Sequence, residues 1–251
     1  AKAMQKAAGR DDVALEICEW QPQASEEELT LPMERVTAQK QHGLYAVEYH
    51  PVGGVLTPDA VRRLNSAIGQ LKQAELRLHP CGGLYIVNLT AQEVPGVLNA
   101  TEDSAKTPFE CSTACIGAST CQQGVRDSQA LLTECVQAVR EAGIAANALP
   151  KMGISGCPPS CGTHQACAMG FVGGVKMIDK VAHPAFTLFL GGRDALGKEA
   201  IGTSVCAMLQ AEIPAFLVEL GRTVEQSGKS FDEWIEANEE TLRTIAQKYA
   251  R

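Results

Sequence analysis

The sequence lacks several features that would assign it to a common class of protein. No apolar run approaches the roughly 20 residues of a membrane-spanning helix. The first residues, AKAMQKAAGRDD, also lack the apolar core of a secretory signal. The formal net charge of −7, from 29 acidic and 22 basic residues, argues against a general affinity for nucleic acids or anionic membranes. We therefore expect a cytoplasmic protein that binds neither nucleic acid nor membrane.

Cysteine, in contrast, is abundant, with ten in 251 residues, although a chain of this length can bury a core without disulfides. Six of the ten fall within residues 111–161. In the reducing compartment that we expect, clustered thiols indicate metal or redox chemistry. Isolated cysteines are more simply interpreted as packing residues, because free cysteine is among the most buried residue types. This interpretation applies to Cys18, Cys135, Cys167 and Cys206.

The first 103 residues are predicted to contain an arm and a small α+β unit. Residues 1–42 are polar and irregular, as expected of an N-terminal arm or linker. Residues 43–103 then show the order strand, helix, strand, strand, helix, with Thr57 as N-cap and Pro58 as the first helical residue. The strands are predicted at 44–49, 75–78 and 84–88, and the second helix at 91–98. This order in about 55 residues predicts a ferredoxin-like half-domain.

Residues 104–251 are predicted to form a second domain that contains both helices and strands. A helix is expected at 128–142 with Gly143 as its C-cap, and two more are expected at 208–226 and 231–249. Strands are expected at 151–155, 171–178 and 185–190. The fold class predicted for the whole chain is α+β, and the first of these strands leads directly into a pair of clustered cysteines.

The clustered cysteines form two close pairs that are far apart in the sequence. Cys115-x5-Cys121 is followed after 35 residues by Cys157-x3-Cys161. Four thiolates that arrive as two pairs can surround a soft metal centre. An alternative is a structural zinc site, in which Cys111 would replace Cys121 and give two C-x3-C pairs of ordinary zinc-ligand spacing.

The second pair lies in a loop rich in glycine and proline, SGCPPSCG. We expect Gly156 and Gly162 to let the backbone come close to a bulky ligand. The two prolines between the cysteines remove backbone donors and stiffen the loop. The amides of Ser160 and Cys161 are therefore expected to donate hydrogen bonds to sulfur.

The segments ACIGASTC and SGCPPSCG together resemble the cofactor motif of the siroheme- and [4Fe–4S]-dependent sulfite and nitrite reductases. The flanking segments LRLHPCGGLYI and TLFLGGRDALG resemble the half-domain before that motif and the strand and turn after it. The resemblance implies that a siroheme and iron–sulfur domain follows the half-domain, and that the four cysteines hold the [4Fe–4S] cluster. Cys161 would also bridge the cluster to the siroheme iron, so that the chain reduces sulfite or nitrite by six electrons.

Siroheme carries eight carboxylates, so the resemblance also implies cationic partners in an acidic chain. Lys151 occupies the position of a lysine that binds the substrate anion in compact members of the family. Gly192 and Arg193 match a turn that contacts the cofactor. The other candidate cations near the motif are Arg126, His164 and Lys176.

The sequence also departs from the family pattern. Leu149 stands where compact members have a second lysine, and His79-Pro80-Cys81 replaces a Thr-x-Arg element. The substrate-binding arginines of full-length members come largely from the other half of the enzyme, so we expect a second half from another chain, a missing segment or a second copy. Because no G-x-G-x-x-G fingerprint is present, electrons are expected from a donor protein or domain. The alternative from another functional class is an electron-transfer or cofactor-binding module without turnover.

Overall fold

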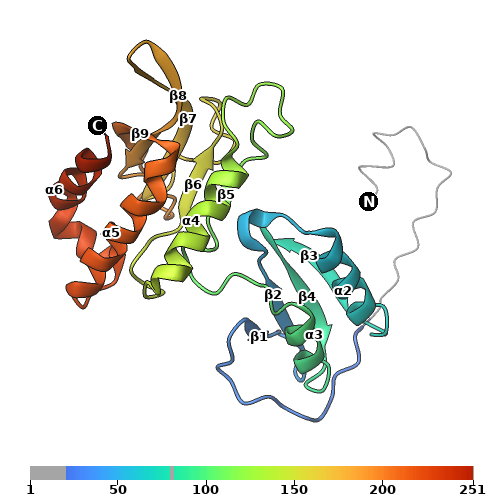
Figure 1. The fold of residues 1–251 in the computed structure, drawn as a ribbon. Helices are drawn as coiled ribbons and strands as arrows, with labels where there is room; N and C mark the ends of the chain where they lie inside the picture. The colour runs from blue at the N-terminus through green and yellow to red at the C-terminus, as the bar shows by residue number, and fades with distance from the viewer. Residues whose placement is uncertain (1–20, 80–81, 251) are drawn as a thin grey trace, which may run out of the picture.

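The computed structural model describes residues 21–79 and 82–250, which form two domains (Figure 1). Residues 1–20 of the predicted arm, with Cys18, lie outside the described residues, as do Pro80 and Cys81 in the turn of the half-domain. Within the part of the chain that is described, no helix is both long and apolar enough to span a membrane.

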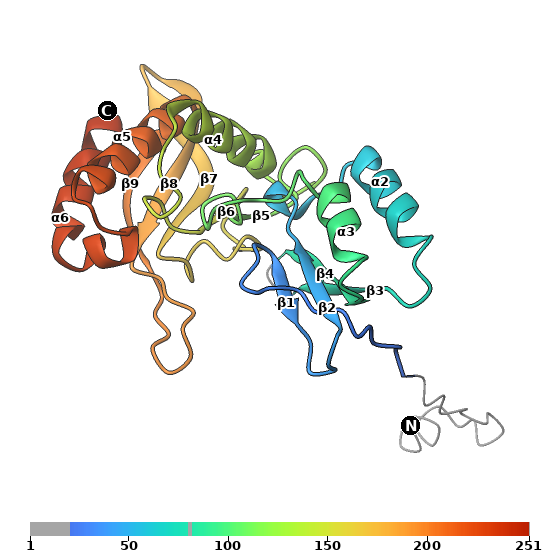
Figure 2. The same cartoon turned by 90° about the horizontal axis from the view of Figure 1, so that it is seen from below.

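The first domain is a four-stranded antiparallel sheet with two helices on one face (Figure 2). The strand order is β1-β2-β4-β3, and the core between sheet and helices is built from side chains such as Val47, Ile86 and Val94. The strands and helices are β1 (Val36–Ala38), β2 (Tyr45–Tyr49), α2 (Pro58–Ile68), β3 (Glu75–His79), β4 (Gly83–Leu89) and α3 (Val94–Ala100). The order that the sequence predicted is observed, and the Thr57 hydroxyl caps α2 by accepting a hydrogen bond from the amide of Ala60.

The sheet begins within the segment that was predicted to be an arm. Strand β1 pairs with β2, with Val36 opposite Val47, and so adds an edge strand before residue 43. Only Val36 of its three residues is buried. A strand this short shows no alternation of buried and exposed residues, so its pairing with β2 could not be read from its own sequence.

The second domain has a mixed five-stranded sheet in the order β5-β6-β7-β8-β9. The pairs β5–β6 and β6–β7 are parallel, whereas β7–β8 and β8–β9 are antiparallel. The strands are β5 (Thr113–Ala114), β6 (Met152–Ser155), β7 (Met169–Ile178), β8 (Val181–Leu190) and β9 (Thr203–Leu209), and the helices are α4 (Ser128–Ala142), α5 (Ile213–Gln226) and α6 (Phe231–Tyr249).

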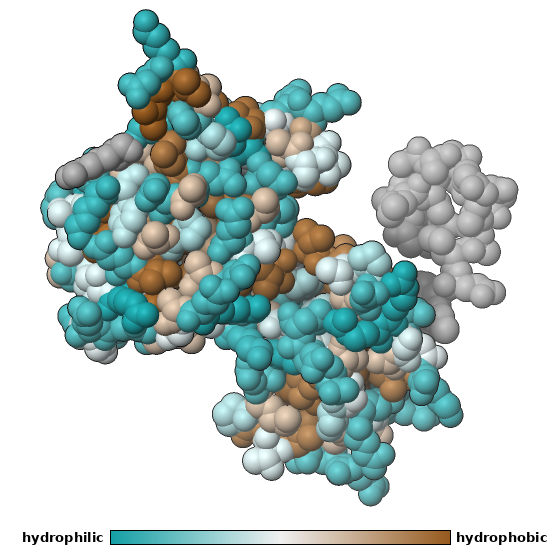
Figure 3. All heavy atoms as spheres, in the orientation of Figure 1, coloured by the Kyte–Doolittle hydropathy of each residue, from teal (hydrophilic) through white to brown (hydrophobic). Residues whose placement is uncertain are grey.

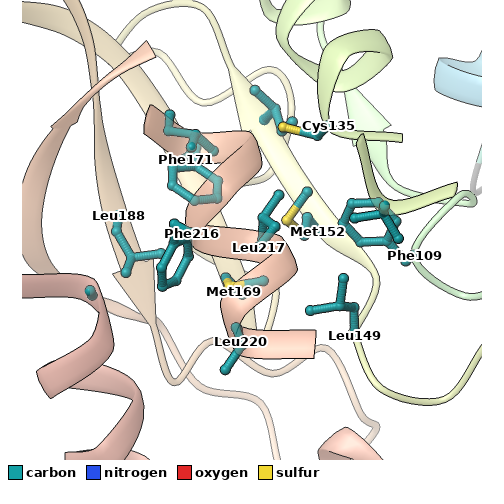
Figure 4. Packing of buried hydrophobic residues seen from close by; sticks show 14 of the residues in the cluster. Phe109, Cys135, Leu149, Met152, Met169, Phe171, Leu188, Phe216, Leu217 and Leu220 are labelled. Carbon is teal, nitrogen blue, oxygen red and sulfur yellow. The ribbon is translucent and has the colours of Figure 1, made fainter. Parts of the chain in front are cut away.

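The three helices share one apolar core with this sheet. Phe216, Leu217 and Leu220 of α5 lie against Met169 and Phe171 of β7 (Figure 4). Helix α4 is capped by Asp127 at its start and by Gly143, in the left-handed conformation, at its end. Cys135 of α4 is fully buried, as its interpretation as a packing residue predicted.

The prediction of a helix over 208–226 is wrong at its start. Residues up to Leu209 belong to β9, Gln210–Glu212 form a 3-10 turn, and α5 begins at Ile213. The segment CAMLQA is rich in good helix formers, but its backbone pairs with β8, where Leu188 is opposite Cys206. Pairing with a neighbouring strand outweighs the weak intrinsic preference for helix here.

One side chain links the two domains, and one hairpin protrudes from the second domain. Gln129 of α4 donates hydrogen bonds to the carbonyls of Gly53 in the half-domain and of Ala114 in β5. The β7–β8 hairpin extends beyond the paired part of β9, and exposed Val175, Met177 and Val181 form an apolar patch just below its hydrophilic tip (Figure 3). The end of the sheet formed by β5 and β6 lies nearest the half-domain (Figure 2).

Candidate metal and anion site

The fold explains how two distant cysteine pairs meet. Cys115 directly follows β5, and the loop with Cys157 and Cys161 directly follows β6. These two strands are parallel neighbours, with Ala114 opposite Ile154, so both loops leave the sheet at the same edge. In open sheets with parallel strands, ligands bind outside the carboxyl ends of the strands. The sheet therefore places the cysteine loops where a ligand site is expected.

Cys157 lies within electrostatic reach of the other three motif thiols. The pKa of Cys157 is raised above its ordinary value by burial, and then by the thiols of Cys115, Cys121 and Cys161. Cys157 is buried and Cys161 is exposed, whereas Cys115 and Cys121 are half-buried. The solvent exposure of the four thiols thus ranges from buried Cys157 to exposed Cys161.

This arrangement differs from a prepared site for a single ion. In a tetrahedral zinc site, bonds of about 2.3 Å place the sulfurs about 3.8 Å apart. Among the residues that the structure describes, no three Cys, His, Asp or Glu side chains converge in this way. The described residues therefore give no support to a prepared single-ion site.

None of the groups that shift the pKa of Cys111 is a motif thiol. Its pKa is raised by burial and by Glu48, and lowered by the ammonium of Lys151. Its neighbour Glu110 is buried and accepts a hydrogen bond from Arg140 Nε at 2.7 Å, which ties this segment to α4. The geometry thus gives no support to a zinc site that includes Cys111.

One hydrogen bond to sulfur joins the two cysteine loops. The amide of Gly156 donates to Cys115 Sγ at 3.1 Å, and Ser128 Oγ lies 3.1 Å from the same sulfur. The expectation that the Ser160 amide donates to sulfur is wrong, because it donates to the carbonyl of Cys157 at 3.4 Å. The amide donor to sulfur that the structure shows thus comes from the residue before the second cysteine pair.

The glycines of the loop make room for backbone rather than for a ligand, which corrects the sequence-based interpretation. A Cβ on Gly156 would lie 2.4 Å from the carbonyl oxygen of Arg126, and one on Gly162 would lie 2.0 Å from that of Ile154. Both distances are far below van der Waals contact. The two glycines therefore allow the cysteine loops to pack tightly on each other and on β6.

This packing gives a prediction for Gly162→Ala. We expect the added methyl group to force the loop away from β6 and to lower the free energy of unfolding by about 3 kcal/mol or more. Gly174→Ala in β7 is the matched control, because a Cβ there would point into open space. Urea denaturation of the two variants measures the difference, and equal stabilities would contradict this account of the loop.

A cavity of about 690 Å³ opens beside the cysteine loop. Cys161 and Lys151 both line it, together with Leu149, Thr163 and Cys167. The structure thus brings the predicted bridging cysteine and the predicted anion-binding lysine to one cavity. Cys167 was interpreted as a packing residue, but it is half-buried in this cavity wall, and Cys206 is half-buried against the core.

Gly192 and Arg193 lie at a neighbouring cavity of about 660 Å³. The two cavities share the wall residues Ala168, Asp194 and Asp232. Gly192 is packed closely, since a Cβ there would lie 2.4 Å from the carbonyl oxygen of Cys167. The side chain of Arg193 is exposed, and its backbone pairs with Ala200.

The other three candidate cations have different surroundings from those expected. Arg126 Nε donates to the carbonyl of Gly174 at 2.7 Å and so ties the first cysteine loop to β7. Lys176 Nζ donates to the carbonyl of Ala250. Burial lowers the pKa of His164 and so favours the neutral imidazole, which counts against its interpretation as a cation.

The residues of the site fit a [4Fe–4S] cluster better than they fit a siroheme. The four thiols suit an iron–sulfur cluster, and Cys161 in the cavity wall suits a ligand shared with a second group. Each cavity, however, has one basic wall residue among those described, Lys151 in the first and Arg193 in the second. Acidic residues of the two walls are Asp194, Asp232, Glu236 and Glu239. A cofactor with eight carboxylates would need further cations from outside these walls.

Comparison with known proteins agrees with this architecture. Residues 37–104 match the family described as the nitrite/sulfite reductase ferredoxin-like half domain. The chain is similar in structure to the Mycobacterium tuberculosis NirA protein, with a TM-score of 0.68 and 21% identity over 87% of this chain and 43% of that chain. It is also similar to dissimilatory sulfite reductase I, with a TM-score of 0.50 and 11% identity over 77% of this chain and 68% of that chain. No protein of curated function matches the sequence significantly.

The chain is α+β, and residues 37–104 form a nitrite/sulfite reductase ferredoxin-like half-domain. The resemblance that the cysteine motif suggested is thus supported by the half-domain match and by the similar folds of the two solved structures. The chain spans less than half the length of the NirA chain.

Proposed function

We propose that this chain is the cofactor-bearing part of a sulfite or nitrite reductase, with a [4Fe–4S] cluster and a siroheme. Two observations carry the proposal: Cys157 lies within electrostatic reach of the other three motif thiols, and Cys161 and Lys151 line one cavity. Cys115, Cys121, Cys157 and Cys161 would hold the cluster, and Cys161 would be shared with the siroheme. When bound, the two cofactors supply the electrons for a six-electron reduction one at a time.

The residues of the chain would bind the anion and exclude water. Lys151 lies in the same cavity wall as Cys161, so its ammonium is placed to neutralise a small oxyanion there. The same ammonium can donate a proton to an oxygen that leaves as water, because a lysine beside a reacting anion acts as a general acid. Leu149, Pro150 and Phe231 form apolar parts of the wall and reduce the access of water to the site.

We propose two protein partners. A second half of the enzyme would complete the cavities, because the two described walls carry a single basic residue each and the chain spans only 43% of the NirA chain. An electron-donor protein or domain would supply the electrons, because the sequence contains no dinucleotide-binding fingerprint.

A second candidate is an electron-transfer or cofactor-binding module without turnover. The acidic residues Asp194, Asp232, Glu236 and Glu239 in the cavity walls favour it, since they oppose the binding of an anionic substrate. The two candidates agree on the four thiols and differ in the role of Lys151.

An absorption spectrum of the anaerobically purified chain tests the proposal. Siroheme gives a Soret band and a band in the red, a cluster alone gives a broad brown shoulder, and zinc gives neither. We expect both sets of bands, four iron atoms in the cluster, and turnover of sulfite or nitrite with reduced methyl viologen. Bands without turnover, also after addition of the second half, would favour the electron-transfer module. A colourless protein with stoichiometric zinc would refute both.

A further inference from the structure

A buried polar cluster lies directly behind the second cysteine pair. His164 Nδ1 is 2.9 Å from Ser155 Oγ and 3.0 Å from Ser160 Oγ, and Ser155 Oγ also accepts a hydrogen bond from the amide of Gly162 at 3.1 Å. Ser155 ends β6, whereas Ser160 and Gly162 flank Cys161. The imidazole therefore connects the end of a strand to both sides of the exposed cysteine.

The imidazole is buried and packed against an aromatic ring. His164 is 1% exposed, and its ring packs edge-on against Phe189 of β8 with the ring centres 4.9 Å apart. Burial lowers its pKa and so favours the neutral ring. Nδ1 carries either one proton or one lone pair, and a serine hydroxyl can donate or accept. In either tautomer, Nδ1 can therefore form one hydrogen bond that the two hydroxyls share.

The loop that this cluster holds has an unfavourable backbone conformation. Ser160 has φ 65° and Thr163 has φ 52°, which is the left-handed region that residues with a Cβ rarely adopt. Such a conformation costs on the order of 1 kcal/mol or more per residue and persists only where the surroundings enforce it. The hydrogen bonds of Ser155, Ser160 and His164 provide this constraint on both sides of Cys161.

We infer that His164 is a positioning residue that fixes Cys161 for the group that its thiolate binds. The inference rests on the proposed function, because it assumes a metal centre at the four thiols. Residues behind the ligands typically change metal affinity by 10–100-fold when they are replaced. Cys161 is the exposed member of the four, so its position depends most on support from within the domain.

The test compares His164→Leu with His164→Asn. Leucine removes the polar atom at the position of Nδ1, whereas asparagine keeps one at the same distance along the side chain. In the metal-free chain, we expect the amides of residues 156–163 to exchange hydrogen at least tenfold faster in His164→Leu and close to the wild-type rate in His164→Asn. In the reconstituted chain, we expect His164→Leu to lose its cluster to a chelator about tenfold faster and to show a shifted midpoint potential.

His50→Leu is the matched control, because His50 is also buried, at 4% exposure, but lies in the half-domain. We expect it to leave the exchange of residues 156–163 unchanged. Ser160→Ala is a milder variant for the case in which His164→Leu does not fold, and it should accelerate exchange in the same segment. The inference would be overturned if hydrogen exchange were unchanged in both Ser160→Ala and His164→Leu. It would also be overturned if leucine and asparagine at position 164 had equal effects, or if His50→Leu had the same effect as His164→Leu. A wild-type chain that binds no cluster would instead refute the proposed function, while the exchange rates would still decide the role of His164.

Discussion

Replacing Cys161 with serine is expected to abolish the reduction of sulfite and nitrite. Cys161 is the one motif cysteine that is proposed to be shared by both cofactors, and it lines the same cavity as Lys151. A hydroxyl is a poor substitute for a soft thiolate ligand of iron, so the two cofactors would lose their connection. Turnover with reduced methyl viologen should fall to background, and the siroheme bands should shift if the pigment is retained.

The matched control is Cys206→Ser, which changes a half-buried cysteine of β9 outside the motif. It should retain wild-type spectra and turnover. Full activity in Cys161→Ser would show that this thiolate is not shared between cofactors, and an equal loss in both variants would indicate general damage to the fold.

The second large effect is expected for Lys151→Met. Among the residues that the structure describes, Lys151 is the one basic residue of the cavity wall that holds Cys161, so its removal would leave an oxyanion without a charge partner. We expect kcat/KM for sulfite or nitrite to fall about 10²–10³-fold, as on removal of a single donor to a reacting anion. Lys151→Arg keeps the positive charge and should retain affinity, with KM close to wild type, while kcat falls because guanidinium does not release a proton.

The exposed Lys72 of the half-domain provides the control Lys72→Met, which should leave kcat and KM unchanged. Steady-state kinetics on all three variants separates the roles of Lys151. Unchanged kcat/KM in Lys151→Met would place the anion elsewhere and would favour the electron-transfer module.

The fold was predictable where its signals are local. The cap residues Thr57 of α2 and Gly143 of α4 lie next to their helices in sequence, and the structure shows both in the expected roles. Strands with enough residues to alternate, such as β2 and β4, were also predicted. Strands β1, β5 and β9 were missed because they are short or carry helix-forming residues, and each is a strand because of its pairing partner.

The candidate site was likewise predictable only where its signals are local in sequence. Spacing alone selected Cys115, Cys121, Cys157 and Cys161, because ligand pairs close in sequence need only a tight loop. The sequence pointed to Cys167 as a packing residue and to His164 as a cation near the motif. Their observed positions, in the cavity wall and beside Ser155 and Ser160, depend on how β6, β7 and β8 pair in the sheet.

The sequence by itself thus determined which residues are candidate ligands of a metal centre and which family the motif resembles, since both depend on residue type and local spacing. The tertiary structure decided that the two cysteine loops lie at one edge of the sheet, because β5 and β6 pair in parallel there. It also decided that His164 is buried, which lowers its pKa, and that Lys151 and Cys161 line one cavity. These properties depend on burial and on contacts between distant segments, which arise only when the chain is folded.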